Sequence, residues 1–287
     1  MEEKKISIVM TFFERHEQLK QTIISISKTN YTNYNIIIVD DCSEQDININ
    51  ELNLLLGYKH NIEVIKINKE HKTWSNPVAV YNMGIHVALE QNPDIIILQN
   101  SECYHYGDIL SYTNNNLTNG NYISYSCLSV TEDTYKSCLY NFEGFLNDKI
   151  EKVVNVGEYY NADGCYWYNH TVQIPVGYDF CSAIYTKDLI ELNGYDERFY
   201  DRLFFGDDDL KMRIQRYGLN IIIPEPLNNP FVVHQYHNHN YISSSDRSSL
   251  FKRGDTLYND IKKYRTYNYR ANHIITDDFD YVINKKK

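Results

Sequence analysis

The chain has 287 residues, a formal net charge of −10 and a hydrophobic fraction of 43%. This hydrophobic fraction predicts a folded globular protein and excludes a disordered one, and the acidic balance argues against a nucleic-acid partner held through its phosphate groups. The sequence has no signal-peptide pattern and no apolar run near the ~20 residues of a membrane span, so we expect a soluble, cytoplasmic protein. The cysteines form no CxxC pair and lie in apolar stretches, which predicts reduced, buried thiols.

Short apolar runs alternate with amphipathic stretches in the first hundred residues. The apolar runs predict buried strands at 6–10, 36–39, 62–67 and 95–98. The stretches between them predict helices at 14–28, 52–56 and 76–90. This βαβαβαβ order predicts an α/β fold with a mainly parallel sheet covered by helices on both faces.

Polar residues follow three of these predicted strands. Thr11 follows the first, Asp40 and Asp41 the second, and the segment 99–102 the fourth. Because ligands of such sheets bind beyond the carboxyl ends of the strands, we expect a ligand site there. No GxGxxG segment follows the first strand, so a dinucleotide-binding fingerprint is absent.

The second half of the chain is less regular. Residues 131–175 have weak periodicity and many Tyr, Asn and Gly residues, which is typical of functional loops or lids. Later strands are predicted at 180–185, 221–223 and 231–233, and short helices at 187–192 and near 256–265.

An acidic triplet opens another predicted helix. Asp207, Asp208 and Asp209 follow Gly206 and begin an amphipathic run that stops at Gly218. One Asp is enough to cap a helix, whereas adjacent carboxylates repel one another unless a cation, a proton or a ligand uses them. The triplet therefore indicates a functional site.

In their order and spacing, these segments resemble glycosyltransferase family 2, which has the GT-A fold. The resemblance covers about residues 5–240 and rests on the segments 7–11, 38–43, 76–84, 194–199 and 206–213. It implies a Rossmann-like single domain over 1–245, with a nucleotide-sugar-binding half (1–105) and an acceptor-binding and catalytic half (106–245). A polar C-terminal extension (246–287) would follow. The implied activity is transfer of a sugar from a nucleotide-sugar donor to an acceptor hydroxyl, usually with inversion.

The resemblance places the donor among the polar residues of the first half. Asp40 or Asp41 would accept the N3–H of uracil, so a uridine diphosphate sugar is the expected donor, with guanine left open. The alternative for this pair is an Asx-turn after a strand, and for Asn76 it is a helix cap. The expected donor contacts are Thr11, Glu14, Asp40, Asp41, Asn76, Asn82, Gln99 and Asn100.

Asp207 aligns with the general base of the family, which takes the proton of the acceptor hydroxyl as that oxygen attacks the anomeric carbon. Its acidic neighbours would raise its pKa. A slip of one residue would make Asp208 the base, so both are catalytic candidates. Gly206 stands where the family has Glu. The acceptor, a glycan or another hydroxyl compound, is expected to contact Trp167, His170 and Asp209.

The family's Asp-x-Asp metal segment is replaced here by Gln99-Asn100-Ser101-Glu102. Glu102 and His234 are the expected ligands of Mn²⁺ or Mg²⁺, because Glu102 is the remaining carboxylate and His234 matches a late metal ligand of related GT-A enzymes. The alternative to a ligand role is an ordinary polar end of a strand for His234, and solvent exposure for His237 and His239. A basic tail that closes as a lid is an alternative source of positive charge for the diphosphate. Its residues are Arg247, Lys252 and Arg253.

Two other functions compete with an active transferase. One is a catalytically silent GT-A-fold protein that binds a glycan or a nucleotide, which the altered metal segment favours and the acidic triplet opposes. The other is a sugar-phosphate nucleotidyltransferase, which is disfavoured because no Gly-rich, basic phosphate loop follows the first strand.

Overall fold

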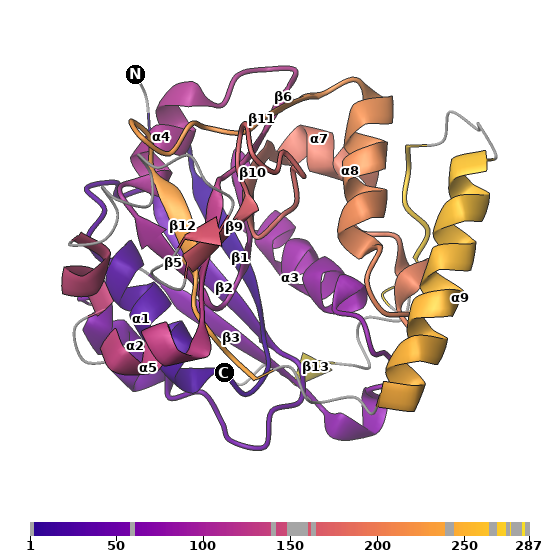
Figure 1. Ribbon diagram of the computed structural model, residues 1–287, viewed down its shortest axis with the longest axis horizontal. Helices are drawn as coiled ribbons and strands as arrows, with labels where there is room; N and C mark the ends of the chain where they lie inside the picture. The colour runs from indigo at the N-terminus through magenta and orange to yellow at the C-terminus, as the bar shows by residue number, and fades with distance from the viewer. Residues whose placement is uncertain are drawn as a thin grey trace.

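The computed structural model describes residues 3–57, 61–138, 142–147, 160–161, 165–238, 244–263, 269–273, 276 and 283–284. The predicted alternation in the first hundred residues is confirmed. Its strands are β1 (Ile6–Phe12), β2 (Tyr34–Asp40), β3 (Ile62–Ile67) and β4 (Ile95–Asn100), and its helices are α1 (His16–Ile26), α2 (Ile49–Leu55), η1 (Lys69–His71) and α3 (Val78–Glu90) (Figure 1).

An eight-stranded sheet forms the centre of the molecule, in the order β11-β6-β10-β4-β1-β2-β3-β13. The strands from the second half of the chain are β6 (Asn121–Ser124), β10 (Cys181–Tyr185), β11 (Asn220–Ile222) and β13 (Ile283–Asn284). β1, β2, β3 and β4 are mutually parallel, whereas β10 is antiparallel to β4, and β13 is antiparallel to β3. The mainly parallel sheet is therefore confirmed, and both predicted halves contribute strands to it.

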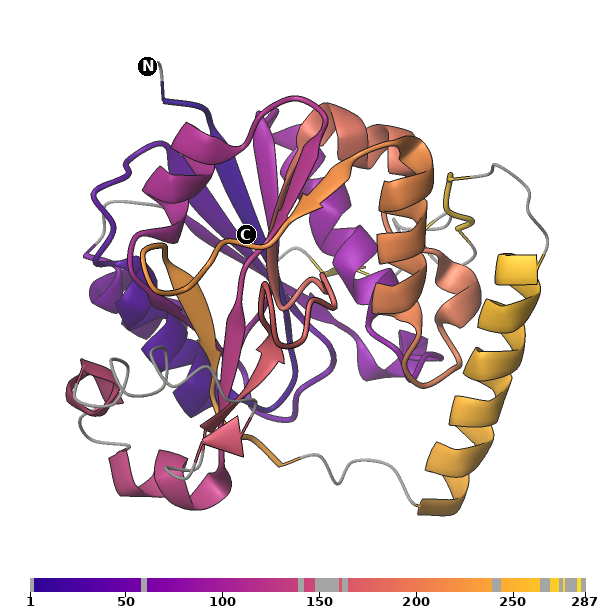
Figure 2. The same cartoon turned by 45° about the horizontal axis from the view of Figure 1, so that its top comes forward.

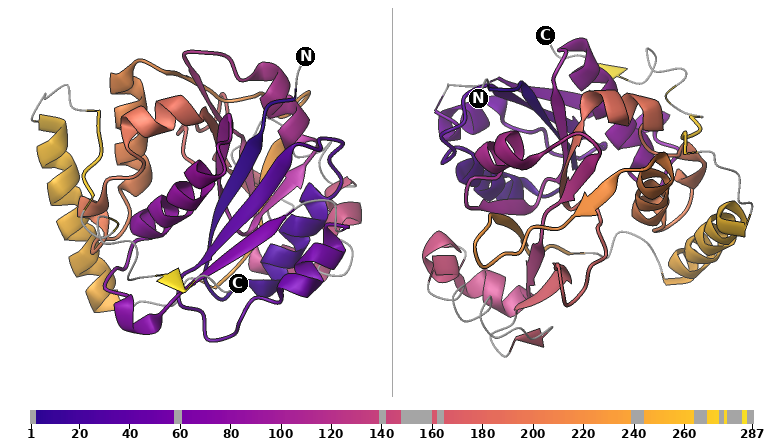
Figure 3. Two further views of the ribbon diagram at one scale, coloured as in Figure 1. Left: turned by 180° about the vertical axis from the view of Figure 1, so that it is seen from behind. Right: turned by 90° about the horizontal axis from the view of Figure 1, so that it is seen from above.

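Helices cover both faces of this sheet, as Figure 3 shows from behind. Alternate residues of β1 point to opposite faces, as the pleat of a strand requires. Ile8 and Met10 belong to the apolar cluster that includes Leu19 and Ile23 of α1. Val9 belongs to the cluster built with α3, α7 and α8. The continuous apolar runs of the sequence are thus strands that are buried on both sides.

A second, five-stranded sheet lies beside the first and was not predicted. Its order is β5-β12-β7-β9-β8. The bounds are β5 (Cys103–Tyr106), β7 (Cys127–Val130), β8 (Tyr160–Asn161), β9 (Cys165–Asn169) and β12 (Phe231–His234), with α4 (Ile109–Asn116) and α5 (Glu132–Cys138) in the same region. The expectation of irregular loops over 131–175 is wrong for α5, for β9 and for the helical residues 142–147. The segments 139–141, 148–159 and 162–164 lie outside the described residues.

The remaining helices lie on the α3 side of the large sheet. They are α7 (Thr186–Leu192), η3 (Glu197–Phe199), α8 (Gly206–Tyr217) and α9 (Ser244–Lys263). α8 carries the acidic triplet in its first turn and ends at Gly218, whose φ of 97° is left-handed. α9 begins well before the predicted start near 256, and Figure 2 shows it at the right edge of the molecule, outside α8.

Two further expectations concern composition. The six cysteines are free and buried, which confirms the predicted thiols. Within the part of the chain that the structure describes, no helix combines the length and the apolar character needed to span a membrane.

Candidate active site

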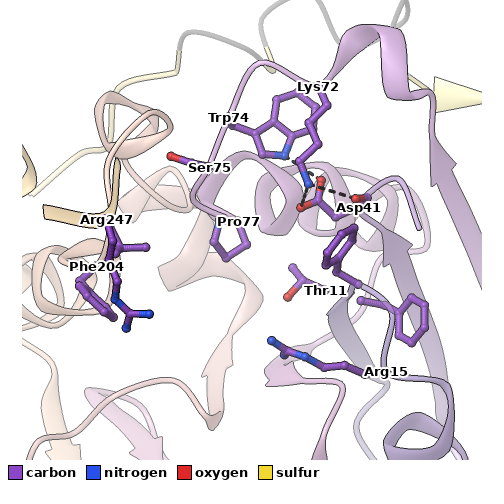
Figure 4. Close-up of a pocket in the computed structure, with 12 residues that line it drawn as sticks. Thr11, Arg15, Asp41, Lys72, Trp74, Ser75, Pro77, Phe204 and Arg247 are labelled. Carbon is purple, nitrogen blue, oxygen red and sulfur yellow. Dashed lines mark hydrogen bonds and ion pairs between the residues drawn. The ribbon is translucent and has the colours of Figure 1, made fainter. Parts of the chain in front are cut away.

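A cavity of about 430 Å³ opens beyond the carboxyl ends of β1 and β2. It is at the sheet edge where open α/β proteins bind ligands, and its volume lies within the range of small-molecule sites. Thr11 comes from the end of β1 and Asp41 follows β2, while Lys72 and Trp74 come from the segment before α3 (Figure 4). The sequence prediction of a ligand site at this edge thus agrees with the geometry.

The two acidic residues after β2 have different surroundings. Asp41 lines the cavity and accepts hydrogen bonds from Trp74 Nε1 at 2.8 Å and from Lys72 Nζ at 2.9 Å (Figure 4). Asp40 is buried, and its carboxylate accepts the backbone N–H of Ser43 at 2.9 Å. Asp40 therefore forms the turn that was the alternative for this pair, and Asp41 is the one that faces the cavity.

Positive charge gathers around the cavity. Arg15, Lys72 and Arg247 all line it, and Figure 4 places Arg15 and Arg247 on opposite sides. The Arg247 guanidinium lies 5.5 Å from the centre of the Phe204 ring. Arg15, Lys72 and Trp74 were not predicted as site residues, although each stands within a few residues of a predicted strand end or helix start.

The other two basic residues of the tail do not reach the cavity. Arg253 pairs with Asp201 at 2.8 Å. Lys252 lines a separate surface pocket beside α9. Of the three basic residues named for the alternative lid, Arg247 is the one placed at the cavity.

A smaller cavity of about 210 Å³ adjoins the first and holds Asp207. Both cavities are lined by Ser75, Pro77, Leu203 and Phe204. The smaller one is also lined by Asn76 and Asn100, two of the expected donor contacts. Asn76 accepts the Val78 N–H at 3.3 Å and donates to the Phe204 carbonyl at 3.1 Å, so it orders the start of α3 as well. Asn100 accepts a hydrogen bond from the Tyr81 hydroxyl at 2.7 Å.

The three acidic residues of α8 separate into three environments. The Asp207 side chain is exposed to the solvent of the smaller cavity. Asp208 accepts a hydrogen bond from the Tyr178 hydroxyl at 2.7 Å. Asp209 is buried and pairs with Arg213 Nε at 2.7 Å, so the expected acceptor contact of Asp209 is not supported. An i,i+4 pair within one helix is instead a structural feature.

Asp207 is poised to accept a proton. Although solvent reaches its carboxylate, the surrounding walls of the cleft displace much of the bulk water. This desolvation, followed by the negative charge of Asp208, raises the pKa of Asp207 to about 6. A carboxylate with this pKa is ionised at neutral pH and is still a useful base.

The backbone before α8 is unusual. Phe204 and Phe205 both have positive φ values, 62° and 64°, which are rare for non-glycine residues. Gly206 follows, and a Cβ atom on it would lie 2.9 Å from Cγ1 of the buried Val78. A Glu at this position, as in the resembled family, would therefore require Val78 or the start of α8 to shift, which is a steric reason for the departure.

Three potential metal ligands meet beside the larger cavity. One ligand atom from each of Glu102, His234 and His237 lies within 4.8 Å of the others, and all three residues are buried. The alternative of solvent exposure is wrong for His237, because the chain after β12 turns its ring onto Glu102, with Nε2 3.3 Å from Oε1. His239 lies outside the described residues. Arg15 donates to the same Glu102 oxygen at 2.6 Å.

The charges around Glu102 keep it ionised. Burial alone would raise the pKa of this carboxyl, but Arg15 and the two imidazoles hold the pKa well below its usual range. Burial lowers the pKa of His234, against the pull of Glu102. Binding of a cation requires an ionised carboxylate and a neutral imidazole, and these are the protonation states that the shifts of Glu102 and His234 favour.

Some expected donor contacts do not line either cavity. The Asn82 side chain accepts the Tyr195 N–H at 2.8 Å and donates to the Tyr195 carbonyl at 2.9 Å, which ties α3 to the segment before η3. Gln99 is fully buried and donates to the Cys103 carbonyl at 2.8 Å. Glu14 accepts the Glu44 N–H and braces the loops after β1 and β2. The geometry gives these three residues structural roles.

Two expected acceptor contacts are likewise placed elsewhere. Trp167 is 1% exposed and packs in the core of the second sheet, with its ring 4.7 Å from that of His170. His170 Nδ1 accepts backbone N–H groups of Val172 and Gln173. Their residue types suggested sugar contacts, whereas Trp167 is a core residue of β9, a strand that was not predicted, and His170 orders the turn that follows β9.

A substitution in α9 tests how this helix is held against the site. Gly254 is buried, and a Cβ on it would lie 2.8 Å from the Phe205 ring and 2.9 Å from the Leu203 carbonyl oxygen. Gly254→Ala is expected to lower the melting temperature, because overpacking costs about 1–3 kcal/mol and outweighs the gain in helix propensity of about 1 kcal/mol. The control is Ser248→Ala at an exposed position of the same helix. A higher melting temperature for Gly254→Ala would show that α9 does not dock as described.

Comparisons with known proteins agree with this fold. TarS from S. aureus superposes with a TM-score of 0.53 at 13% identity, over 88% of this chain and 39% of that one. A shorter form of TarS in complex with UDP gives 0.55 at 12% identity, over 88% and 65%. The mannosyltransferase PcManGT from Pyrobaculum calidifontis, in complex with GDP-Man and Mn²⁺, gives 0.51 at 10% identity, over 84% and 59%. This chain thus spans less than two thirds of each of these structures.

Sequence comparison supplies the family. No curated protein matches the chain at a significant level. Residues 7–169, more than half of the chain, match the family described as Glycosyl transferase family 2. Together with the sheet order, this match shows that the chain belongs to glycosyl transferase family 2.

Proposed function

We propose that this protein transfers a sugar from a nucleotide diphosphate sugar to an acceptor hydroxyl, with inversion at the anomeric carbon. The observation that carries the proposal is the junction of the two cavities. They share Ser75, Pro77, Leu203 and Phe204, so a basic cavity large enough for a nucleotide opens directly towards Asp207. The donor would lie in the larger cavity, and the acceptor would approach through the smaller one.

Asp207 is the base in this proposal. The acceptor hydroxyl loses its proton to the Asp207 carboxylate while its oxygen bonds to the anomeric carbon. The bond from that carbon to the diphosphate oxygen breaks, and its electron pair leaves with the diphosphate. Arg15, Lys72 and Arg247, which line the donor cavity, would stabilise the negative charge that develops there. A single displacement of this kind inverts the anomeric configuration.

We propose uracil as the base of the donor. The Asp41 carboxylate can accept about four hydrogen bonds, and those from Lys72 and Trp74 leave room for the single N3–H of uracil. The structural neighbours do not distinguish uracil from guanine as the donor base, because TarS was solved with UDP and PcManGT with GDP-Man.

Asp41→Asn is therefore expected to weaken UDP binding. A hydrogen bond to a charged group contributes roughly 1.5–3 kcal/mol, which corresponds to a rise of about 10- to 150-fold in Kd. Asp40→Asn is the matched control and should leave Kd nearly unchanged, because Asp40 lies behind the cavity wall and accepts from Ser43. Isothermal titration calorimetry with UDP measures both. Equal and small effects would mean that neither carboxylate reads the base.

We also propose that Glu102, His234 and His237 hold a divalent cation. The donor set fits one, since it combines a buried, ionised carboxylate with two imidazoles. Imidazole ligands suit transition metals, so Mn²⁺ fits better than Mg²⁺, which prefers oxygen. The cation would act as a Lewis acid towards the donor diphosphate. Arg15 already contacts Glu102, so it competes with the cation for the same oxygen.

A thermal-shift screen of nucleotides tests the proposed donor class. A ligand present at 100 times its Kd stabilises the folded state by about 2.7 kcal/mol. We expect UDP or a UDP-sugar to raise the melting temperature more than ADP, CDP or GDP, and Mn²⁺ to increase that rise. No stabilisation by any nucleotide would contradict the proposal.

A further inference from the structure

A second carboxyl group lies behind Asp207. Asp179 stands just before β10, is 5% exposed and lines the smaller cavity together with Asp207. A hydrogen bond between the two carboxyl groups joins them. The Tyr195 hydroxyl donates to Oδ2 of Asp179, and the ring of Tyr195 stacks on that of Tyr81 with the ring centres 4.8 Å apart. Asp179 is therefore held by Tyr195 and by Asp207, at the wall of the cavity that both carboxyl groups line.

The surroundings of this pair hold negative charge and phenols. Asp208 and Tyr178 face it from α8 and from the segment before β10. Tyr81 of α3 and Tyr122 of β6 lie close enough to interact electrostatically with both carboxyl groups. Two carboxyl groups in contact cannot both ionise freely, and a hydrogen bond between them requires a proton. Burial and the charge of Asp207 raise the pKa of Asp179 well above its usual range, so the proton resides on Asp179.

We propose that Asp179 and Asp207 share one proton, with Asp179 as a protonated positioning residue that donates a hydrogen bond to the Asp207 carboxylate. This inference deepens the proposed function and rests on it. The donated hydrogen bond has two consequences. It orients Asp207 so that its free oxygen faces the acceptor, and it lowers the pKa of Asp207 against the desolvation that raises it. Asp179 thereby keeps the base ionised at neutral pH.

The transfer step balances with this pair. The acceptor O–H bond breaks and its proton goes to Asp207, while the acceptor oxygen bonds to the anomeric carbon. The bond from that carbon to the diphosphate breaks, and the electron pair goes to the diphosphate oxygen. The pair then carries two protons and no charge. One proton returns to water through the open cavity before the next turnover.

The pH dependence of kcat/KM distinguishes this role from a structural one. Because Asp207 acts as a base, activity should fall as the pH drops through its pKa of about 6. Asp179→Ala removes the donated hydrogen bond, so the acid limb of its kcat/KM profile should move to higher pH. The activity of this variant relative to the parent should therefore be lower at pH 6 than at pH 8. Asp179→Asn offers an amide N–H in place of the acid and should keep most activity with an acid limb near that of the parent. If Asp179 were ionised, Asp179→Asn would remove a negative charge and move the acid limb to lower pH, which would overturn the proposal.

Infrared difference spectra of the protein without ligands provide a test that needs no activity. The parent at neutral pH should show a protonated-carboxyl band that is lost in Asp179→Asn. The matched control is Asp188→Asn at the buried Asp188 of α7, outside both cavities, which should retain the band. A parent spectrum that does not change on Asp179→Asn would overturn the shared proton. If the parent transfers no sugar from any donor, the proposed function fails, and the infrared comparison still decides this inference.

Discussion

Replacing Asp207 by Asn is expected to lower kcat by a factor of about 10² or more and to leave the Kd of the donor nearly unchanged. Asn has the size of Asp but cannot take the acceptor proton. Asp207 lines the smaller cavity and not the nucleotide-sized one, so donor binding should survive. Steady-state kinetics and calorimetry on the same preparation separate the two effects.

Asp208→Asn and Asp209→Asn are the matched controls in the same helix turn. Asp208 is held by Tyr178, and its charge raises the pKa of Asp207, so Asp208→Asn should move the acid limb to lower pH with a modest effect on kcat. Asp209→Asn should mainly lower stability, because Arg213 would lose its buried partner. Near-normal turnover in Asp207→Asn together with loss of turnover in Asp208→Asn would move the base by one residue.

Removal of divalent metal is expected to have the second large effect. Excess chelator should lower turnover by about 10²–10³-fold, which is the usual effect of removing one group that stabilises developing negative charge. Added Mn²⁺ should restore turnover. Glu102→Gln should raise the Mn²⁺ concentration needed for half-maximal activity, because it removes the only carboxylate of the triad. Activity assays with a metal titration measure both.

The basic side chains of the donor cavity are the competing source of charge. If Arg15, Lys72 and Arg247 stabilise the diphosphate alone, chelator should do little and Arg247→Ala should abolish most turnover. Arg253→Ala is the matched control from the same helix, since Arg253 is exposed and pairs with Asp201. Full activity in excess chelator would contradict the metal site.

The sequence was sufficient to predict the strands whose burial on both faces produces a continuous apolar run. β1, β2, β3 and β4 are covered on both faces, so each appears as an unbroken apolar run. The acidic triplet was visible because Asp207, Asp208 and Asp209 exceed what a helix cap needs.

The second sheet and part of the site were not visible for a physical reason. β5 and β7 have four residues each, too few to establish a period. The strand predicted at 231–233 is β12, but its sequence does not indicate its partner strands. His237 joins Glu102 only through the pairing of β12 with β5. Asp179 becomes notable only because folding brings it onto Asp207. Asn82 and Trp167 were predicted to contact the substrates because of their residue types. In the structure, Asn82 instead bonds the backbone of Tyr195, and Trp167 packs in the core.

Release of nucleoside diphosphate from a panel of nucleotide sugars, measured with and without Mn²⁺ and across a set of hydroxyl acceptors, tests the central claim most directly. We expect release from a UDP-sugar, stimulated by Mn²⁺, dependent on an acceptor and lost in Asp207→Asn. Binding of a nucleotide sugar without release, across the whole acceptor set, would contradict the proposed transferase and identify a catalytically silent member of the family.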